Sequence, residues 1–81
     1  MKYDIYLPSH LPDDDFTDSV IRKQSAILLE TLGNNFQFNH SGVGRLGWYN
    51  KWQVECEPTM LTFLRLKLNM EFDYEPNTEN I

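Results

Sequence analysis

Cysteine and basic residues are scarce in this sequence. Its single cysteine, Cys56, excludes an internal disulfide and any metal site built from a pair of cysteines. Seven Lys and Arg residues stand against twelve Asp and Glu residues, which gives a formal net charge of −5. A protein that binds a nucleic-acid backbone needs a concentrated basic face. The composition therefore argues against direct nucleic-acid binding and fits a partner protein with a basic surface better.

Long apolar runs are also missing. The first five residues, Met-Lys-Tyr-Asp-Ile, have no apolar stretch of the kind found in a signal peptide. The longest mainly apolar window, residues 60–68, is interrupted by Thr62, Arg65 and Lys67. We therefore expect no membrane-spanning segment, and a reducing, cytoplasmic location is the default expectation.

What the chain does contain is enough apolar material for one core. It has 81 residues, of which 41% are hydrophobic and 14% aromatic. That length and composition predict a folded globule rather than a disordered segment, and one domain rather than two. We place this domain at residues 1–76 and expect residues 77–81 to form a polar C-terminal tail.

The strongest periodic pattern lies near the C-terminus. From residue 64 to 74 the sequence alternates strictly, with apolar residues at Leu64, Leu66, Leu68, Met70, Phe72 and Tyr74. Side chains on a strand point alternately to opposite faces, so this period of two predicts a long, half-buried β-strand.

The other expected elements precede this strand. Alternating residues predict strands over 2–7 and 36–40, and a third strand that ends at Glu57 before Pro58. An apolar stripe predicts a helix over 14–32, ended by Gly33. The run of three aspartates at 13–15 is interpreted as a helix cap rather than a metal site. Gln24 lies within the stripe, either as a buried hydrogen-bonding residue or between two narrower stripes.

Charge pairing suggests how the last two strands align. If Glu57 faces Arg65, then Glu55 faces Lys67, and continuing the same antiparallel register brings Lys51 opposite Glu71. This predicts an α+β fold of the order β-α-β-β-β, an antiparallel-rich four-stranded sheet with one helix on one face. The alternative makes residues 58–68 a second helix, which gives the ferredoxin-like βαββαβ plan.

A glycine motif follows the second strand. Gly42, Gly44 and Gly47 satisfy the spacing G-x-G-x-x-G, but the next segment resembles a strand rather than the helix that a dinucleotide site requires. A hairpin loop is the better interpretation. A weaker alternative is an anion-binding loop formed by Ser41, Gly42, Gly44 and Arg45.

The sequence shows no convincing catalytic set. Cys56 with His10 or His40 would supply a nucleophile and a base, but Cys56 falls on the expected core face, where a thiol is inert. The pair Glu55 and Glu57 is expected to face basic residues on an open surface. We therefore expect no enzyme, no cofactor and no metal.

Surplus apolar and acidic residues point to an interface instead. A 19-residue helix is roughly 28 Å long and would not cover a strand of roughly 36 Å, so we expect exposed apolar surface that contacts a second chain. The expected contact residues are aromatic, apolar or acidic: Trp48, Tyr49, Met70, Phe72, Tyr74, Glu71, Asp73 and Glu75.

Two functional hypotheses follow. The first is a small acidic, non-enzymatic protein-interaction module that binds a partner protein or a second copy of itself as a dimer. Its sharper form is an inhibitor of a nucleic-acid-handling or defence enzyme, encoded by a phage or another mobile element. The second is a small-anion-binding or catalytic subunit that uses the glycine loop, residues 41–47.

Overall fold

The computed structural model describes residues 1–9, 17–44 and 47–77. The elements follow in the order β1 (Lys2–Pro8), α1 (Thr17–Leu32), β2 (Phe36–Gly44), β3 (Gly47–Glu55), α2 (Pro58–Leu68) and β4 (Asp73–Pro76). His10, the aspartate run at 13–15 and Arg45 lie outside the described residues, so the helix cap expected at 13–15 stays a prediction.

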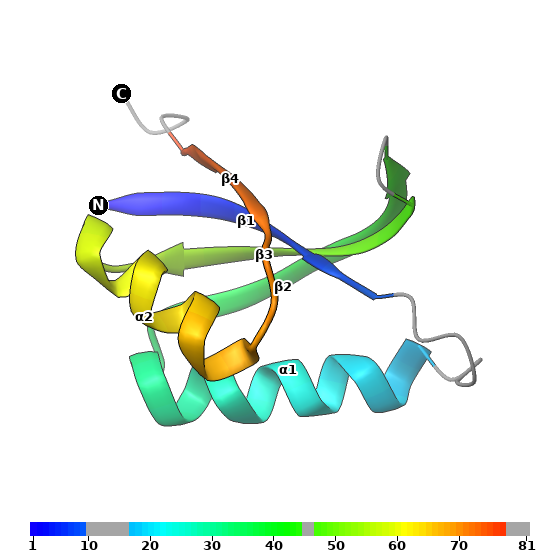
Figure 1. Ribbon diagram of the computed structural model, residues 1–81, viewed down its shortest axis with the longest axis horizontal. Coiled ribbons are helices and arrows are strands. Elements are labelled where there is room, and N and C mark those ends of the chain that lie inside the picture. The colour runs from blue at the N-terminus through cyan, green and yellow to red at the C-terminus, as the bar shows by residue number, and fades with distance from the viewer. Residues whose placement is uncertain (10–16, 45–46, 78–81) are drawn as a thin grey trace.

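The four strands form one antiparallel sheet in the order β2-β3-β1-β4. Both helices lie on the same side of this sheet, and none of the described residues forms a helix on the opposite face (Figure 1). The expected α+β class and four-stranded antiparallel sheet are confirmed. The element order is the βαββαβ plan of ferredoxin-like folds, so the expectation of a single helix was wrong and its alternative was right.

Residues 58–68 form a helix because a second apolar period runs through them. Leu61, Leu64 and Leu68 are spaced by three and four residues, and all three are buried on one side of α2. Pro58 occupies the first turn, where its missing N–H costs nothing. Asn69 ends the helix in the left-handed conformation, with φ 54°. The predicted strand over 64–74 is therefore replaced by the end of α2, a turn and the short β4.

The expected pairing of the last two strands is wrong for the same reason. Glu57 lies before α2 and Arg65 and Lys67 lie within it, so none of them takes part in a hairpin ladder. Instead β3 pairs with β1, and Lys51 lies opposite Tyr6. The Lys51 Nζ is 3.9 Å from a carboxylate oxygen of Asp4, which replaces the predicted partner Glu71.

The core lies between the sheet and the two helices. It contains the alternate residues Tyr3, Ile5 and Leu7 of β1, Trp52 and Val54 of β3, and apolar residues of both helices: Leu28, Leu32, Leu61, Leu64 and Leu68. Fully burying a side chain such as that of Leu64 contributes about 2 kcal/mol. Leu66, expected in the core, points outward and is 75% exposed.

Gln24 is a buried hydrogen-bonding residue, so the first of the two alternatives for its position in the apolar stripe is correct. Its Oε1 accepts hydrogen bonds from Asn50 Nδ2 and Trp52 Nε1, both at 3.1 Å. Its Nε2 donates to the carbonyl oxygen of Pro8 at 2.9 Å. Ser41, which is exposed on β2, extends this network toward solvent, because its hydroxyl donates to Asn50 Oδ1 at 2.7 Å. The network fastens α1 to β1, β2 and β3.

The start of the expected polar tail is attached to the sheet. Asn77 donates its backbone N–H to the Lys2 carbonyl at 2.9 Å and its side-chain amide to Asp4 at 3.1 Å. Asn77 therefore belongs to the sheet's hydrogen-bonded part rather than to a separate tail, and residues 78–81 lie outside the described part.

Candidate binding cleft

A row of aromatic and polar side chains crosses the sheet face opposite α1 and α2. The ring of Tyr49 on β3 contacts the ring of Tyr6 on β1 edge to face, with centroids 5.3 Å apart. On its other side Tyr49 contacts the ring of His40 on β2 at 6.2 Å. Directly opposite residues of paired strands share a face, and the register of β1 with β3 and β4 places Lys51 and Asp73 there as well. This open face is therefore built mainly of aromatic and charged side chains.

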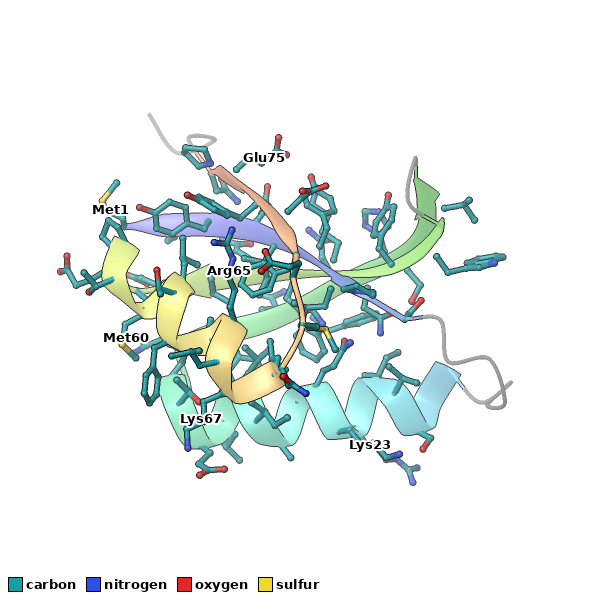
Figure 2. All side chains as sticks on the ribbon, in the orientation of Figure 1. Met1, Lys23, Met60, Arg65, Lys67 and Glu75 are labelled. Carbon is teal, nitrogen blue, oxygen red and sulfur yellow. The ribbon has the colours of Figure 1, made fainter. Side chains whose placement is uncertain are left out.

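Tyr6 connects the row to β4. Its hydroxyl donates a hydrogen bond of 2.6 Å to a carboxylate oxygen of Glu75, which is labelled on β4 in Figure 2. This hydrogen bond, together with burial and the charges of Glu75 and Asp4, raises the pKa of Tyr6 to about 12. The phenol is thus held in its neutral form, and it positions the Glu75 carboxylate.

The two glycines of β2 make room for Tyr49. A Cβ on Gly42 would lie 2.7 Å from the Tyr49 hydroxyl oxygen, and one on Gly44 would lie 3.2 Å from its ring. The Tyr49 ring therefore lies against the backbone of β2 where no side chain interferes. Two glycines of the G-x-G-x-x-G spacing thus have a packing role in the described strand.

An open cleft of about 680 Å³ lies next to this row. Its walls come from the end of β1, the β2–β3 hairpin, one residue of α2 and the segment 71–75. The lining residues are Tyr6, Pro8, Gly44, Gly47, Trp48, Tyr49, Arg65, Glu71, Phe72, Asp73, Tyr74 and Glu75. We call this feature the acidic cleft, because its lining, within the part of the chain that the structure describes, has three carboxylates and one basic side chain.

The cleft arises where the chain leaves the sheet. β4 pairs with β1 from Tyr3 to Tyr6, so on the β4 side Leu7 and Pro8 have no β-ladder partner among the described residues. The β2–β3 hairpin extends past this point and bends away from the helices (Figure 1). The diverging hairpin and the segment before β4 form the two sides of the opening.

Arg65 balances part of the negative charge. Its Nε is 3.9 Å from a Glu71 carboxylate oxygen, and its guanidinium lies 5.5 Å and 5.7 Å from the ring centroids of Phe72 and Tyr74. Figure 2 labels Arg65 between α2 and β4. Among the described lining residues, one guanidinium and three carboxylates give a formal charge of −2.

Seven of the eight residues expected at an interface line the acidic cleft, and Met70 is the exception. Trp48 and Tyr74 are 57% and 46% exposed, as a contact surface requires. Phe72 is only 5% exposed and belongs to the core. The reasoning that selected these residues was wrong in one respect, because residues 64–74 form the end of α2, a turn and the start of β4 rather than a long uncovered strand. They meet because the hairpin and the segment before β4 face each other.

Three lining residues were not anticipated. Tyr6 and Pro8 belong to β1, and Arg65 was expected to face Glu57. A signal for Tyr6 was present, since an aromatic residue occupied the polar side of an alternating strand. Its neighbours Tyr49 and Glu75 are 43 and 69 residues away in sequence, and only the strand order brings them together.

The described part of the expected anion loop is occupied by other contacts. Residues 41–44 belong to β2 and 47 begins β3, so the hairpin connection contains only residues 45 and 46. The Ser41 hydroxyl is committed to Asn50, and Gly42 and Gly44 lie against Tyr49. Gly47, with φ +108°, supplies the backbone conformation for the turn.

The candidates for catalysis do not converge within the described residues. Burial raises the pKa of the Cys56 thiol, which disfavours the thiolate. The ring of His40 contacts Asn39 and Tyr49. In the ranges that the structure describes, no three His, Cys, Asp or Glu side chains are grouped to hold a metal ion.

Neither described helix is long and apolar enough to cross a membrane.

Comparison with known proteins gave no match: no family model, no curated protein and no solved structure matches this chain.

Proposed function

We propose that this protein is a non-enzymatic interaction module that binds a basic segment of a partner protein in the acidic cleft. The observation that carries the proposal is the composition of the lining, whose described residues include three carboxylates, five aromatic rings and one guanidinium. Carboxylates attract lysine and arginine side chains, and aromatic rings bind cations over their faces. Aromatic residues are also frequent anchors of protein interfaces.

The position of the charges supports this choice of partner. Asp73 and Glu75 lie on the open face, directly opposite Tyr6 and Asp4 of β1. Both are exposed, so a cation approaching from solvent reaches them without displacing core residues. One form of the proposal is an inhibitor whose acidic surface occupies the basic groove of a nucleic-acid-handling enzyme.

The test uses blocked amino acids as probes. N-acetyl-arginine methylamide and its lysine counterpart are titrated into isotope-labelled protein, and backbone amide shifts are followed by NMR. We expect saturable shifts at residues 48–49 and 71–75, and none with N-acetyl-glutamate methylamide. Absence of shifts at the cleft with both cationic probes would contradict the proposal.

A charge-matched pair of variants separates cleft binding from general attraction to an acidic protein. The double variant Asp73→Asn, Glu75→Gln removes two cleft carboxylates and should weaken binding of the arginine probe about tenfold. The control, Glu30→Gln with Glu55→Gln, has the same net charge but changes acids outside the cleft lining. Equal weakening by both variants would show that the cleft does not determine binding.

A further inference from the structure

The two edges of the sheet differ in how they are protected. β4, at one edge, has four residues, of which two are acidic and one is proline. Shortness, charge and proline are features that prevent an edge strand from pairing with another chain. β2, at the other edge, has nine residues and contains no proline, lysine, arginine or acid. Only β4 carries these protective features.

The outer side of β2 pairs with none of the described strands. Within the described residues, β2 is hydrogen-bonded to β3 alone among the strands. Most of its residues are exposed. A bulge lies between Phe38 and His40, and beyond it the segment 40–44 pairs regularly with β3 as far as the turn. This regular segment, which we call the β2 edge, presents an uninterrupted line of backbone groups.

We propose that the β2 edge pairs antiparallel with the β2 edge of a second copy of this chain. Two identical strands that pair antiparallel are related by a two-fold axis, so each N–H that faces outward meets a carbonyl of the other copy. The charge distribution selects this surface: two chains of net charge −5 repel each other, and β2 is the edge strand without formal charge when His40 is neutral.

Two exposed apolar residues, one on the β2 edge and one opposite it on β3, gain cover from the pairing. Val43 and Trp48 lie opposite each other in the hairpin and are 63% and 57% exposed. A two-fold axis perpendicular to the sheet places these residues of both copies on the same face of the joined sheet. The result is one continuous eight-stranded sheet whose two acidic clefts open on the same face. The pairing rests on β2 alone and does not depend on the proposed function.

Sedimentation equilibrium from micromolar to millimolar chain concentrations tests the proposal. We expect a reversible monomer–dimer equilibrium for the wild-type protein. Val43→Lys places a charge at the β2 edge and should leave the protein monomeric. Leu66→Lys is the matched control, since Leu66 is 75% exposed on α2, and should dimerise as the wild type does. A monomeric wild-type protein over the whole range would overturn the proposal.

A second measurement needs no variant. Amide hydrogen exchange of the wild-type chain should slow in the segment 40–44 as the concentration rises, while exchange in β4 stays constant. Slowing in β4 or at the helices instead would place the contact elsewhere and overturn the proposal. So would a β2 edge that is protected only when a different protein is added, because that edge would then belong to that partner.

Discussion

Gln24 shows how one polar residue within an apolar stripe fixes the arrangement of several elements. It is 3% exposed, and its amide group is shared among Pro8, Asn50 and Trp52. Because buried donors and acceptors are costly when they lack partners, these bonds specify where α1 lies on the sheet. The sequence pattern could place Gln24 in the stripe but could not show that its partners come from two distant strands.

Replacing Gln24 by alanine should therefore destabilise the protein strongly. The variant leaves the side-chain donors of Asn50 and Trp52 without their acceptor in the core, and we expect a loss of about 3 kcal/mol in the free energy of unfolding. Urea denaturation measures this loss. Lys23→Ala, at the exposed neighbouring position, is the control and should change the free energy by less than about 0.5 kcal/mol. A similar small effect for both variants would contradict the structural role of the network.

Tyr6 gives the protein a defined response to alkaline pH. Its pKa is raised from 10.0 to about 12 in the folded protein, chiefly by the hydrogen bond to Glu75. A raised pKa means that the folded state holds the proton more tightly than the unfolded state. The resulting stabilisation is complete below pH 10 and is lost as the pH rises from 10 to about 12.

Spectrophotometric titration of tyrosine absorbance checks this expectation. The wild-type protein should show a tyrosine step near pH 12, and Tyr6→Phe should remove that step. In the variant, the free energy of unfolding should also depend less on pH between 10 and 12 than in the wild type. Persistence of an unchanged step near pH 12 in the variant would assign it to another tyrosine.

Among the elements, the β2–β3 hairpin shows most clearly what sequence patterns predict and what they miss. The glycines correctly indicated a hairpin, because the following segment alternates like a strand. The reason for Gly42 and Gly44 was not visible, since it depends on the Tyr49 ring across the strand pair. Strand alternation is a local signal, whereas this packing depends on the pairing register.

Gly42→Ala tests this contact between elements. The added methyl group would lie 2.7 Å from the Tyr49 hydroxyl, so the ring must move away from Tyr6 and His40, at a cost of about 1.5 kcal/mol. In a Tyr49→Ala background the same substitution should cost nothing, because the ring is absent. A double-mutant cycle by urea denaturation measures this coupling. Equal costs of Gly42→Ala in both backgrounds would contradict the packing role, and Gly44→Ala should show a smaller coupling.

The wrong prediction of a strand instead of a helix within residues 58–74 has a physical cause. Two apolar patterns overlap in this segment. Residues 61, 64 and 68 are spaced by three and four residues, as on one face of a helix, and the apolar residues from 64 to 74 are spaced by two, as on one face of a strand. Leu66, exposed on α2, completes the alternation without belonging to the core. A single sequence contains both patterns, and only tertiary packing against α1 and the sheet selects the helix.

For the whole molecule, the α+β class and a four-stranded antiparallel sheet could be predicted, but the strand order and the bounds of the last strand could not. Charge pairing favoured the last two strands as neighbours, while the structure inserts β1 between β3 and β4. That insertion also forms the cleft, because Tyr6 reaches both Tyr49 and Glu75 only from a central strand. The composition of the surface was thus readable from the sequence, and its geometry was not.

The central place of β1 has a consequence for how the chain folds. Only β2 and β3 are joined by a short connection, and an isolated hairpin is marginally stable at best. The other two pairings, β1 with β3 and β1 with β4, join segments far apart in sequence. Their loop-closure entropy must be overcome before most sheet hydrogen bonds form. The sheet therefore gains little from partial assembly, and this topology favours all-or-none folding in which both ends of the described chain take part.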